Sequence, residues 1–266
     1  MTVLSTADLS GRVALITGVG TPGGIGFATA EAMAAAGAQV AIADLPSTEV
    51  REVVARLPGT GHSAHTVDIT KEDEVSALVD AVVATHGRLD ALVNAAAILI
   101  VQPFLDIDLA SWERTLQVNT TGTFLVARAA ARHMVQNGGG QIVLVASNVA
   151  RIPRINNASY AASKAAVIHL ARCMAMELGQ HGVSVNALCP GSTATTMLID
   201  NQAKGDSSRL DGIIKGSIEQ WRTGIPLGRL AEPADQAALA VFLASPGGRY
   251  ISGQAICVDG AQTYFG

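Results

Sequence analysis

The sequence has few charged residues and no excess of positive charge. Charged side chains make up 15% of the 266 residues, and the formal net charge is -4 with a pI near 5.8. Proteins that bind nucleic acid concentrate Lys and Arg on one surface to neutralise phosphates. We therefore expect no nucleic-acid partner.

Long apolar runs are also missing. The first ten residues, "MTVLSTADLS", lack the basic start and the apolar stretch of a secretory signal. No uninterrupted apolar run approaches the roughly 18 residues of a membrane span. These absences predict a soluble, cytoplasmic protein that does not enter a membrane.

Cysteine is scarce as well. Cys173, Cys189 and Cys257 are far apart and form no CxxC pair, and the six histidines are scattered along the chain. The cysteines are therefore expected to be small buried side chains, and no metal site is expected.

Apolar residues are abundant, at 49% of the chain, which is enough for one large buried core. Short β-branched runs alternate with Ala-rich stretches of helical period, and most of the runs are apolar throughout, as in strands that are buried on both faces. We expect one α/β domain over 1–266, a doubly wound Rossmann-type fold with a parallel sheet of about seven strands and helices on both faces. The predicted strands are 12–17, 39–44, 64–69, 89–95, 141–147, 183–189 and 255–260, and the predicted helices lie near 25–36, 48–57, 72–86, 111–136, 158–180 and 232–244.

One region does not fit this alternation. Residues 192–229 are polar and are interrupted by glycines. A long irregular segment inside a compact domain is usually functional, so we expect it to be a substrate lid.

A glycine-rich stretch, "TGVGTPGGIG" at 17–26, follows the first predicted strand. Glycines at a strand-to-helix turn let a pyrophosphate approach the helix N-terminus closely. Two spacings are possible: Gly18 with residues 20 and 23 forms GxGxxG, whereas Gly18, Gly24 and Gly26 form a wider TG-x5-GIG turn around Ile25. We favour the wider spacing, because Gly26 would then let the next helix pack closely on the sheet.

An acidic residue at the end of the second strand completes this dinucleotide-binding pattern. Asp44 has that position, where its carboxylate would bond the ribose hydroxyls of the adenosine and repel a 2′-phosphate. The sequence therefore favours NAD over NADP as the cofactor.

A pair of reactive side chains lies in "SYAASKAA". Tyr160 and Lys164 are four residues apart and share one face of a predicted helix. An ammonium about 4 Å from the phenol would lower its pKa by roughly three units at an effective dielectric near 20, toward the range of a general base. Ser147 ends a strand at the same edge of the sheet, where its hydroxyl could hold a substrate oxygen.

The chain resembles the short-chain dehydrogenase/reductase family over essentially its whole length. The resemblance rests on the glycine-rich turn, Asp44, "VDIT" (67–70), "NAAA" (94–97), "QVNTTG" (117–122), "VAS" (145–147), "YAASK" (160–164) and "NALCPG" (186–191). It implies hydride transfer between a secondary alcohol and NAD, with a catalytic tetrad of Asn119, Ser147, Tyr160 and Lys164. Asn119 would hold a water that links Lys164 to solvent. The resemblance also implies a homotetramer built through the helices of 111–136 and 158–180.

The same resemblance implies further cofactor contacts and two departures. Asp68 and Ile69 would flank the adenine, Asn94 would brace the sheet, Pro190 and Gly191 would follow the sixth strand at the cofactor, and Thr193 and Thr195 would bond the nicotinamide carboxamide, with Tyr160 and Lys164 also touching the cofactor. The glycine-rich turn is two residues longer than usual. Ala97 stands where the family often has glycine, so the backbone there must tolerate a Cβ.

Local matches within the family resemble 2,3-dihydro-2,3-dihydroxybenzoate dehydrogenases, which oxidise a cyclic dihydrodiol carboxylate. They include Ile98-Leu99, "PRI" at 153–155 and "PGST" at 190–193. Arg154, between Ser147 and Tyr160, could pair with a substrate carboxylate. Alternatives are another cyclic or sugar-like alcohol, a 3-oxoacyl thioester, which Asp44 disfavours, and a catalytically silent NAD-binding scaffold or sensor.

Overall fold

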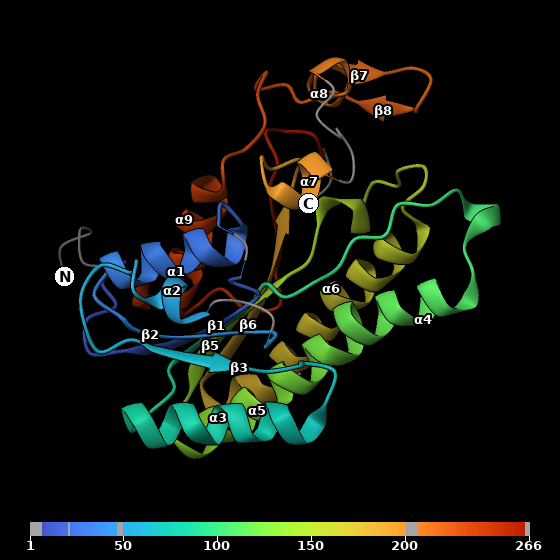
Figure 1. Cartoon of the computed structure of the whole chain (residues 1–266). Helices are drawn as coiled ribbons and strands as arrows, with labels where there is room; N and C mark the ends of the chain where they lie inside the picture. The colour runs from blue at the N-terminus through green and yellow to red at the C-terminus, as the bar shows by residue number, and fades with distance from the viewer. Residues whose placement is uncertain (1–6, 21, 47–49, 201–206, 264–266) are drawn as a thin grey trace.

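A computed structural model describes residues 7–20, 22–46, 50–200 and 207–263. Its central element is a seven-stranded parallel sheet with the strand order β3-β2-β1-β4-β5-β6-β9 (Figure 1). The chain runs outward from β1 to β3, returns to the middle at β4, and runs outward again to β9, which confirms the predicted doubly wound fold. The strands are β1 (Val13–Thr17), β2 (Gln39–Asp44), β3 (Ser63–Thr66), β4 (Ala91–Asn94), β5 (Gly140–Val145), β6 (Val183–Pro190) and β9 (Ala255–Val258).

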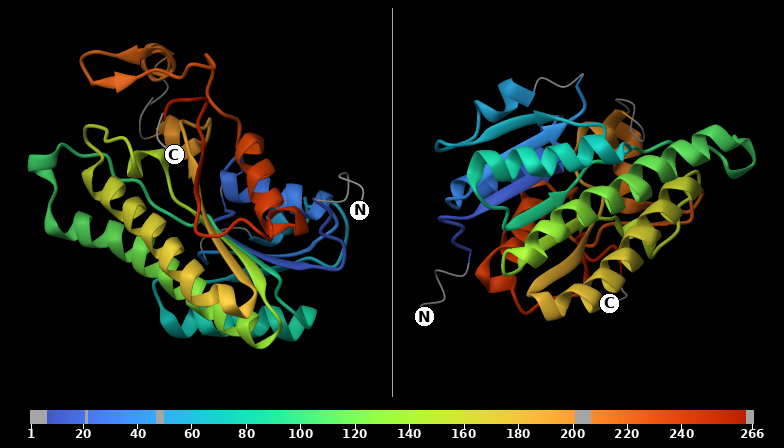
Figure 2. Two further views of the ribbon diagram at one scale, coloured as in Figure 1. Left: turned by 180° about the vertical axis from the view of Figure 1, so that it is seen from behind. Right: turned by 90° about the horizontal axis from the view of Figure 1, so that it is seen from below.

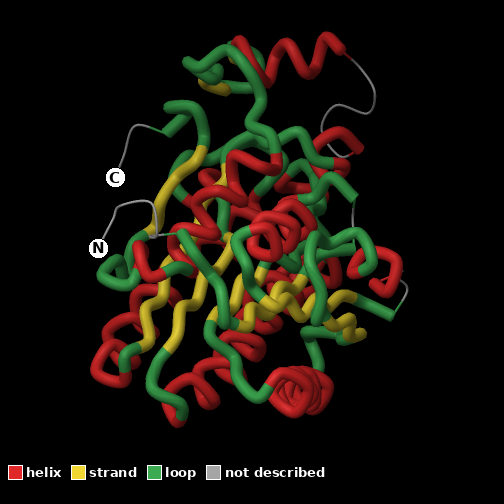
Figure 3. The backbone as a smooth tube through the Cα atoms, turned by 90° about the vertical axis from the view of Figure 1, so that its left-hand side faces the viewer, coloured by secondary structure: helices red, strands yellow, loops and turns green. Residues whose placement is uncertain are grey.

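Helices cover both faces of this sheet. One layer holds α1 (Ile25–Ala35), α2 (Val50–Val54) and α9 (Pro233–Ala244); the other holds α3 (Glu72–His86), α5 (Thr123–Gln136) and α6 (Ala158–Leu178). Figure 2 shows α3, α5 and α6 side by side below the sheet, and Figure 3 shows the strands between the two layers. Single-turn helices are η2 (Phe104–Asp106), η4 (Asn148–Ala150), η5 (Gly179–His181) and η7 (Pro246–Gly248).

Strand side chains alternate between the two cores that these layers form. Leu15 of β1 packs with the α3–α5–α6 layer, whereas its neighbour Ile16 packs with the α1–α2–α9 layer, and both are fully buried. Each strand therefore needs apolar residues at consecutive positions, which explains the continuous apolar runs of the sequence.

The predicted helix 111–136 is not continuous. It consists of α4 (Leu109–Leu116), a π-helical turn η3 (Gln117–Gly122) and α5. A π turn contains an extra residue, and such turns are frequent at functional sites. The apolar spacing on either side is helical, so the sequence pattern does not reveal the insertion.

The expectation of an irregular segment at 192–229 was wrong in part. The segment contains α7 (Thr196–Leu198), α8 (Ser207–Lys215) and an antiparallel pair, β7 (Gly216–Ser217) and β8 (Arg222–Thr223). Figure 1 shows α8 and the β7–β8 pair projecting beyond α7 from the body of the molecule. Leu198, Ile213 and Ile225 form a small separate core. Residues 201–206 lie outside the described residues.

In the part of the chain that the structure describes, no helix combines the length and apolar character needed to cross a membrane.

Candidate active site

A cleft of about 310 Å³ lies at the carboxyl ends of the strands. In open parallel sheets, ligands bind at this edge, where the strand order reverses, here between β1 and β4. Most of the predicted site residues line the cleft: Gly18, Gly24, Ile25, Gly26, Asp44, Asp68, Ile69, Ser147, Arg154, Tyr160, Lys164, Pro190, Gly191, Thr193 and Thr195. Asn94 and Asn119 lie behind this lining.

The glycine-rich turn brings backbone against backbone. A Cβ on Gly26 would overlap the carbonyl oxygen of Gly18, and a Cβ on Gly18, which has a positive φ of 77°, would overlap the backbone of Ala96. Gly24 is the N-cap of α1, which has no side-chain cap and no acidic residue in its first turn. The positive end of this helix therefore faces the cleft, as an anion site requires. This geometry agrees with the wider glycine spacing; position 21 lies outside the described residues.

The three alanines after β4 have a backbone conformation that tolerates a Cβ. Ala95, Ala96 and Ala97 all line the cleft, and none of them has a positive φ. The Cβ at the position where the family often has glycine therefore costs no backbone strain here.

Two carboxylates lie on the same side of the cleft. Asp44, at the end of β2, accepts hydrogen bonds from the backbone N–H of Gly20 at 2.7 Å and of Leu45 at 2.7 Å, so the carboxylate ties the glycine-rich turn to the strand. Asp68 accepts from the hydroxyl of Thr70 at 2.7 Å, which lowers the pKa of Asp68, and from the backbone N–H of Thr70.

Ser147 and Tyr160 meet across the cleft. Ser147 lies two residues beyond β5, and Tyr160 lies in the first turn of α6. Burial raises the pKa of Tyr160 to about 12, against the opposing effect of a hydrogen bond with the Ser147 side chain. The phenol is therefore a strong base once it is ionised, and it is protonated at neutral pH.

Lys164 is a fully buried ammonium group. Its Nζ donates to the carbonyl of Val145 at 2.7 Å and lies 5.7 Å from the centre of the Tyr160 ring. Burial lowers the pKa of Lys164 to about 8. In this arrangement the ammonium is held on a backbone carbonyl, and burial has the largest effect on the pKa of the phenol.

The two asparagines act as braces. Asn119, in the π turn, accepts from the Ile98 N–H at 2.8 Å and donates to the Ile98 carbonyl at 2.9 Å and to the Ser163 hydroxyl at 3.0 Å. Asn94 accepts from Thr17 at 2.6 Å and donates to Thr123 at 2.9 Å. These contacts join α6 to the loop after β4, and β1 to the first residue of α5.

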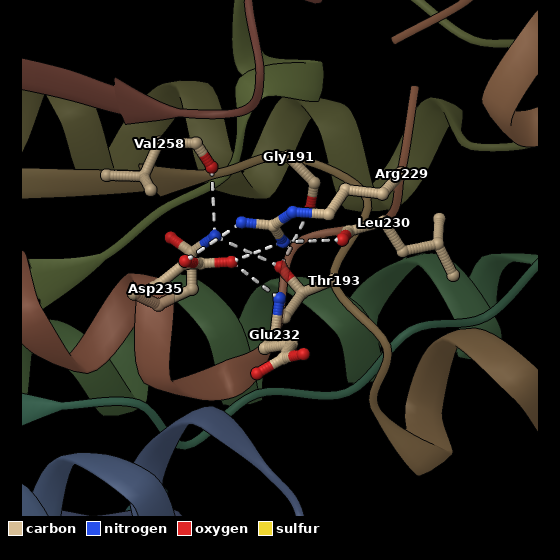
Figure 4. Close-up of polar contacts among 8 residues, drawn as sticks. Gly191, Thr193, Arg229, Leu230, Glu232, Asp235 and Val258 are labelled. Carbon is tan, nitrogen blue, oxygen red and sulfur yellow. Dashed lines mark hydrogen bonds and ion pairs between the residues drawn. The ribbon is translucent and has the colours of Figure 1, made fainter. Parts of the chain in front are cut away.

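Thr193 lies in a network that Figure 4 shows. Its hydroxyl donates to the Gly191 carbonyl at 3.2 Å and accepts from Gln236 at 3.2 Å, and Gln236 also donates to the Val258 carbonyl at 2.9 Å. The Thr193 side chain is thus already bonded within the protein. The Thr195 hydroxyl caps α7 by accepting from the Leu198 N–H at 3.3 Å.

Arg154 also lines the cleft and has buried polar neighbours. Its Nη2 donates to Gln262 at 2.8 Å and to Asn148 at 3.3 Å, and burial lowers its pKa to about 10. Sequence reasoning missed these neighbours, together with Ser192 and Arg222, which adjoin them. They come from separate segments and share no local motif.

The comparisons with known proteins agree with this architecture. The family described as enoyl-(acyl carrier protein) reductase matches residues 18–263, and the chain belongs to the short-chain dehydrogenase/reductase family of oxidoreductases. The chain is 36% identical to 2,3-dihydro-2,3-dihydroxybenzoate dehydrogenase of Bacillus subtilis (strain 168), over 98% of this chain and 99% of the relative.

Two further relatives act on ring-shaped alcohols by their names. Cis-4-hydroxycyclohexanecarboxylate dehydrogenase of Sinomonas cyclohexanicum is 37% identical over 95% of this chain and 96% of its own. The solved structure of 7α-hydroxysteroid dehydrogenase complexed with NADH and 7-oxo glycochenodeoxycholic acid has a TM-score of 0.86 and 35% identity, covering 98% of both chains.

Proposed function

We propose that this chain is an NAD-dependent dehydrogenase of a cyclic secondary alcohol, with Tyr160 as the general acid and base. The observation that carries the proposal is the hydrogen-bonded pair of Ser147 and Tyr160 in the cleft, next to the buried Lys164. Retention of all the reactive groups argues against the silent NAD-binding scaffold or sensor. The relatives named above, which are dehydrogenases of cyclic alcohols, support the same reaction class.

The residues of the cleft fit a dinucleotide. Gly18, Gly26 and Gly191 lie where a Cβ would overlap neighbouring backbone or the Asp259 side chain, and the uncapped start of α1 would receive the pyrophosphate. Asp44 would bond the ribose hydroxyls, which favours NAD over NADP. Bound NAD supplies the hydride acceptor.

The protein supplies orientation and proton transfer. Ser147 would hold the alcohol oxygen, and Tyr160 would remove its proton. Ionisation of Tyr160 needs a positive charge close to the phenol, because burial alone raises its pKa. Lys164 can provide that charge if its ammonium turns from the Val145 carbonyl toward the phenol, and Asn119 would keep the neighbouring backbone in place. The reverse steps reduce a ketone.

For the substrate we favour a cyclic dihydrodiol carboxylate or a related ring-bearing hydroxy acid. Arg154 lines the cleft, and its guanidinium group is held by the Gln262 and Asn148 side-chain oxygens. The similarity to two dehydrogenases whose named substrates are ring carboxylates supports this choice. A neutral cyclic or sugar-like alcohol is the alternative if Arg154 only shapes the loop.

The test is turnover of cis-4-hydroxycyclohexanecarboxylate and a dihydrodiol carboxylate with NAD. Tyr160→Phe should lower kcat by about a thousandfold, since it removes the group that transfers the proton. Tyr250→Phe is the matched control, because Tyr250 is 99% exposed and should leave turnover unchanged. NAD binding without turnover of any cyclic alcohol would favour the scaffold.

We also propose a homotetramer, assembled through α4, α5 and α6. Phe124 and Met176 on these helices are large exposed apolar side chains, at 39% and 86% exposure. Apolar groups gathered on a helix face are commonly covered by another subunit. Light scattering at micromolar concentration tests this, and the mass of a monomer would contradict it.

A further inference from the structure

A sharp turn follows β9 and directs one side chain into the interior. Gly260 and Ala261 have positive φ angles of 63° and 66°, and the next residue, Gln262, is 1% exposed. A left-handed alanine is strained, because its Cβ crowds the backbone, and such residues persist where the surrounding contacts require them. Gln262 belongs to none of the sequence motifs described above.

The side-chain oxygen of Gln262 accepts hydrogen bonds from two other segments of the chain. Arg154 donates to it at 2.8 Å and Asn148 at 3.1 Å, both from the loop after β5, and Ser192 donates at 3.4 Å from the segment after β6. The amide nitrogen of Gln262 donates to the Thr223 carbonyl at 3.4 Å. A guanidinium group only donates and a carbonyl only accepts, so these partners fix the orientation of the amide.

Asn148 is the residue directly after Ser147, and both line the cleft. The amide nitrogen of Asn148 donates to Gln262 and, at 3.2 Å, to the Asp259 carboxylate, and its oxygen accepts from Arg154 at 3.3 Å. Asn148 is 2% exposed, so water has little access to these groups. Two of the three partners of Asn148 therefore come from the segment after β9.

The position of Asn148 affects that of Ser147. Asn148 begins the single turn η4, in which the N–H of Val149 donates to the Ser147 hydroxyl oxygen at 3.3 Å. The Ser147 side chain also has a hydrogen bond with the Tyr160 side chain, and this bond lowers the pKa of Tyr160 against the larger effect of burial. A shift of η4 would therefore move Ser147 relative to Tyr160 and weaken the bond between them.

We propose that Gln262 is a positioning residue for the proton transfer, which keeps Ser147 beside Tyr160 by holding Asn148. This inference rests on the proposed function. The contact reaches Ser147 from a segment more than a hundred residues later in the chain. Because Gln262 also bonds to the Thr223 carbonyl in β8, one amide joins the β7–β8 pair to the loop that carries Ser147.

The kinetic test is the pH dependence of kcat for the oxidation of cis-4-hydroxycyclohexanecarboxylate with saturating NAD. Gln262→Met keeps a similar volume and removes the amide, so kcat should fall by about ten- to a hundredfold. The rise of kcat with pH should also move up by about one unit, because a displaced Ser147 no longer favours the phenolate of Tyr160. KM for NAD should change by less than about twofold, since NAD binding does not use this amide.

Gln262→Glu tests rescue by a conservative change. Its carboxylate keeps an oxygen that accepts from Asn148 and Arg154, although it cannot donate to Thr223. It should recover most of kcat and the pH dependence of the wild type. Equal losses in Gln262→Glu and Gln262→Met would contradict a role through this oxygen and overturn the inference.

Gln141→Met is the matched control for the loss of a buried glutamine amide. Gln141 is 8% exposed and also accepts from an arginine, Arg12 at 2.5 Å, but it lies near the start of β5, at the opposite end of the strand from the cleft. Gln141→Met should lower the free energy of unfolding without changing kcat or its pH dependence. If Gln141→Met and Gln262→Met change kcat and its pH dependence equally, the effect is general destabilisation and the inference is overturned.

A double mutant tests whether Gln262 acts through Asn148. Asn148→Ala should lower kcat by a factor similar to that of Gln262→Met. Combining the two changes should lower kcat by less than about a further twofold, because residues that act through one contact are not additive. Losses that multiply would show two independent effects and overturn the inference.

Amide hydrogen exchange separates this inference from the proposed function, because it needs no substrate. The N–H groups of residues 149–152 bond back to Ser147 and Asn148, so their exchange should be faster in Gln262→Met than in the wild type and in Gln141→Met. Faster exchange without oxidation of any cyclic alcohol by the wild type would overturn the proposed function and leave the hold of Gln262 on this loop standing. Oxidation by the wild type, with exchange and kcat unchanged in Gln262→Met, would overturn the inference alone.

Discussion

The two ends of the cleft are built in different ways. Where we propose that the cofactor binds, the cleft is lined by a few continuous stretches: the turn before α1, the end of β2 and the loop after β3. Where we propose that the substrate binds, Arg154 and Ser192 line the cleft and bond to side chains from separate segments, Gln262 and Arg222. Where backbone packs against backbone, few substitutions fit. In a cluster of side chains, one residue can be substituted while the others stay.

The strongest test of this difference is Gly26→Ala at the cofactor end. The added Cβ overlaps the Gly18 carbonyl oxygen, so we expect a loss of about 3 kcal/mol in the free energy of unfolding and loss of NAD binding. Gly212→Ala is the control, because no atom lies within 4 Å of its added Cβ and it is in a helix. Denaturant unfolding and NAD titration measure both. Wild-type stability of Gly26→Ala would show that the turn can relax.

Lys164, between the two ends, gives a pH-dependent test. Its pKa is lowered from 10.5 to about 8, so between these values the unfolded chain holds a proton that the folded chain does not. Deprotonation there favours folding, and the free energy of unfolding should rise by roughly 3 kcal/mol from pH 8 to pH 10.5.

Lys164→Met should remove this rise. The raised pKa of Tyr160 lowers the free energy of unfolding above pH 10, and it does so in both proteins. Subtracting the values of the variant from those of the wild type therefore leaves the contribution of Lys164. Denaturant unfolding at several pH values gives the measurement. A parallel pH dependence of the two proteins would show that the folded-state pKa of Lys164 is ordinary.

At the substrate end, Arg154→Ala should raise KM for an acidic substrate far more than it lowers kcat. A charge-assisted pair contributes roughly 1.5 to 3 kcal/mol, equivalent to about ten- to a hundredfold in kcat/KM. A remote anchor binds ground state and transition state alike, so kcat should change little. Steady-state kinetics on the acid and its amide measure this, and an equal loss on both would assign Arg154 to loop structure.

The smallest expected effect is at Asp44. NAD should be preferred over NADP by at least about tenfold, or on the order of 1.4 kcal/mol, because a carboxylate repels the 2′-phosphate. Asp44→Ala should narrow this ratio of kcat/KM values, while Asp80→Ala on the exposed side of α3 should not. Equal use of both cofactors by the wild type would contradict the assignment.

The sequence predicted the fold and most of the cleft lining well, because both depend on local patterns. Strands buried on both faces require continuous apolar runs, and the turn before α1 requires glycines at particular positions. The same reasoning missed the π turn, since a single inserted residue leaves the apolar spacing helical on both sides.

The direction in which a side chain points, and its hydrogen-bond partners from distant parts of the sequence, could not be predicted. The spacing of Tyr160 and Lys164 shows that they share a helix face, but not that the ammonium donates to the Val145 carbonyl. Likewise, nothing near Gln262 in the sequence indicates that its side chain accepts a hydrogen bond from Arg154.

The π turn fixes the number of residues between α4 and α5 as well as their identity. Each residue of an α-helix turns the chain by about 100°, so deleting one residue from 117–122 would rotate α5 relative to α4 by that angle. If α5 stayed in place, Asn119 would lose its hydrogen bond with Ile98. If α4 stayed in place, Thr123 would lose its hydrogen bond with Asn94. A substitution in this stretch changes the contacts of one residue, whereas a change in its length moves the braces of two strands at once.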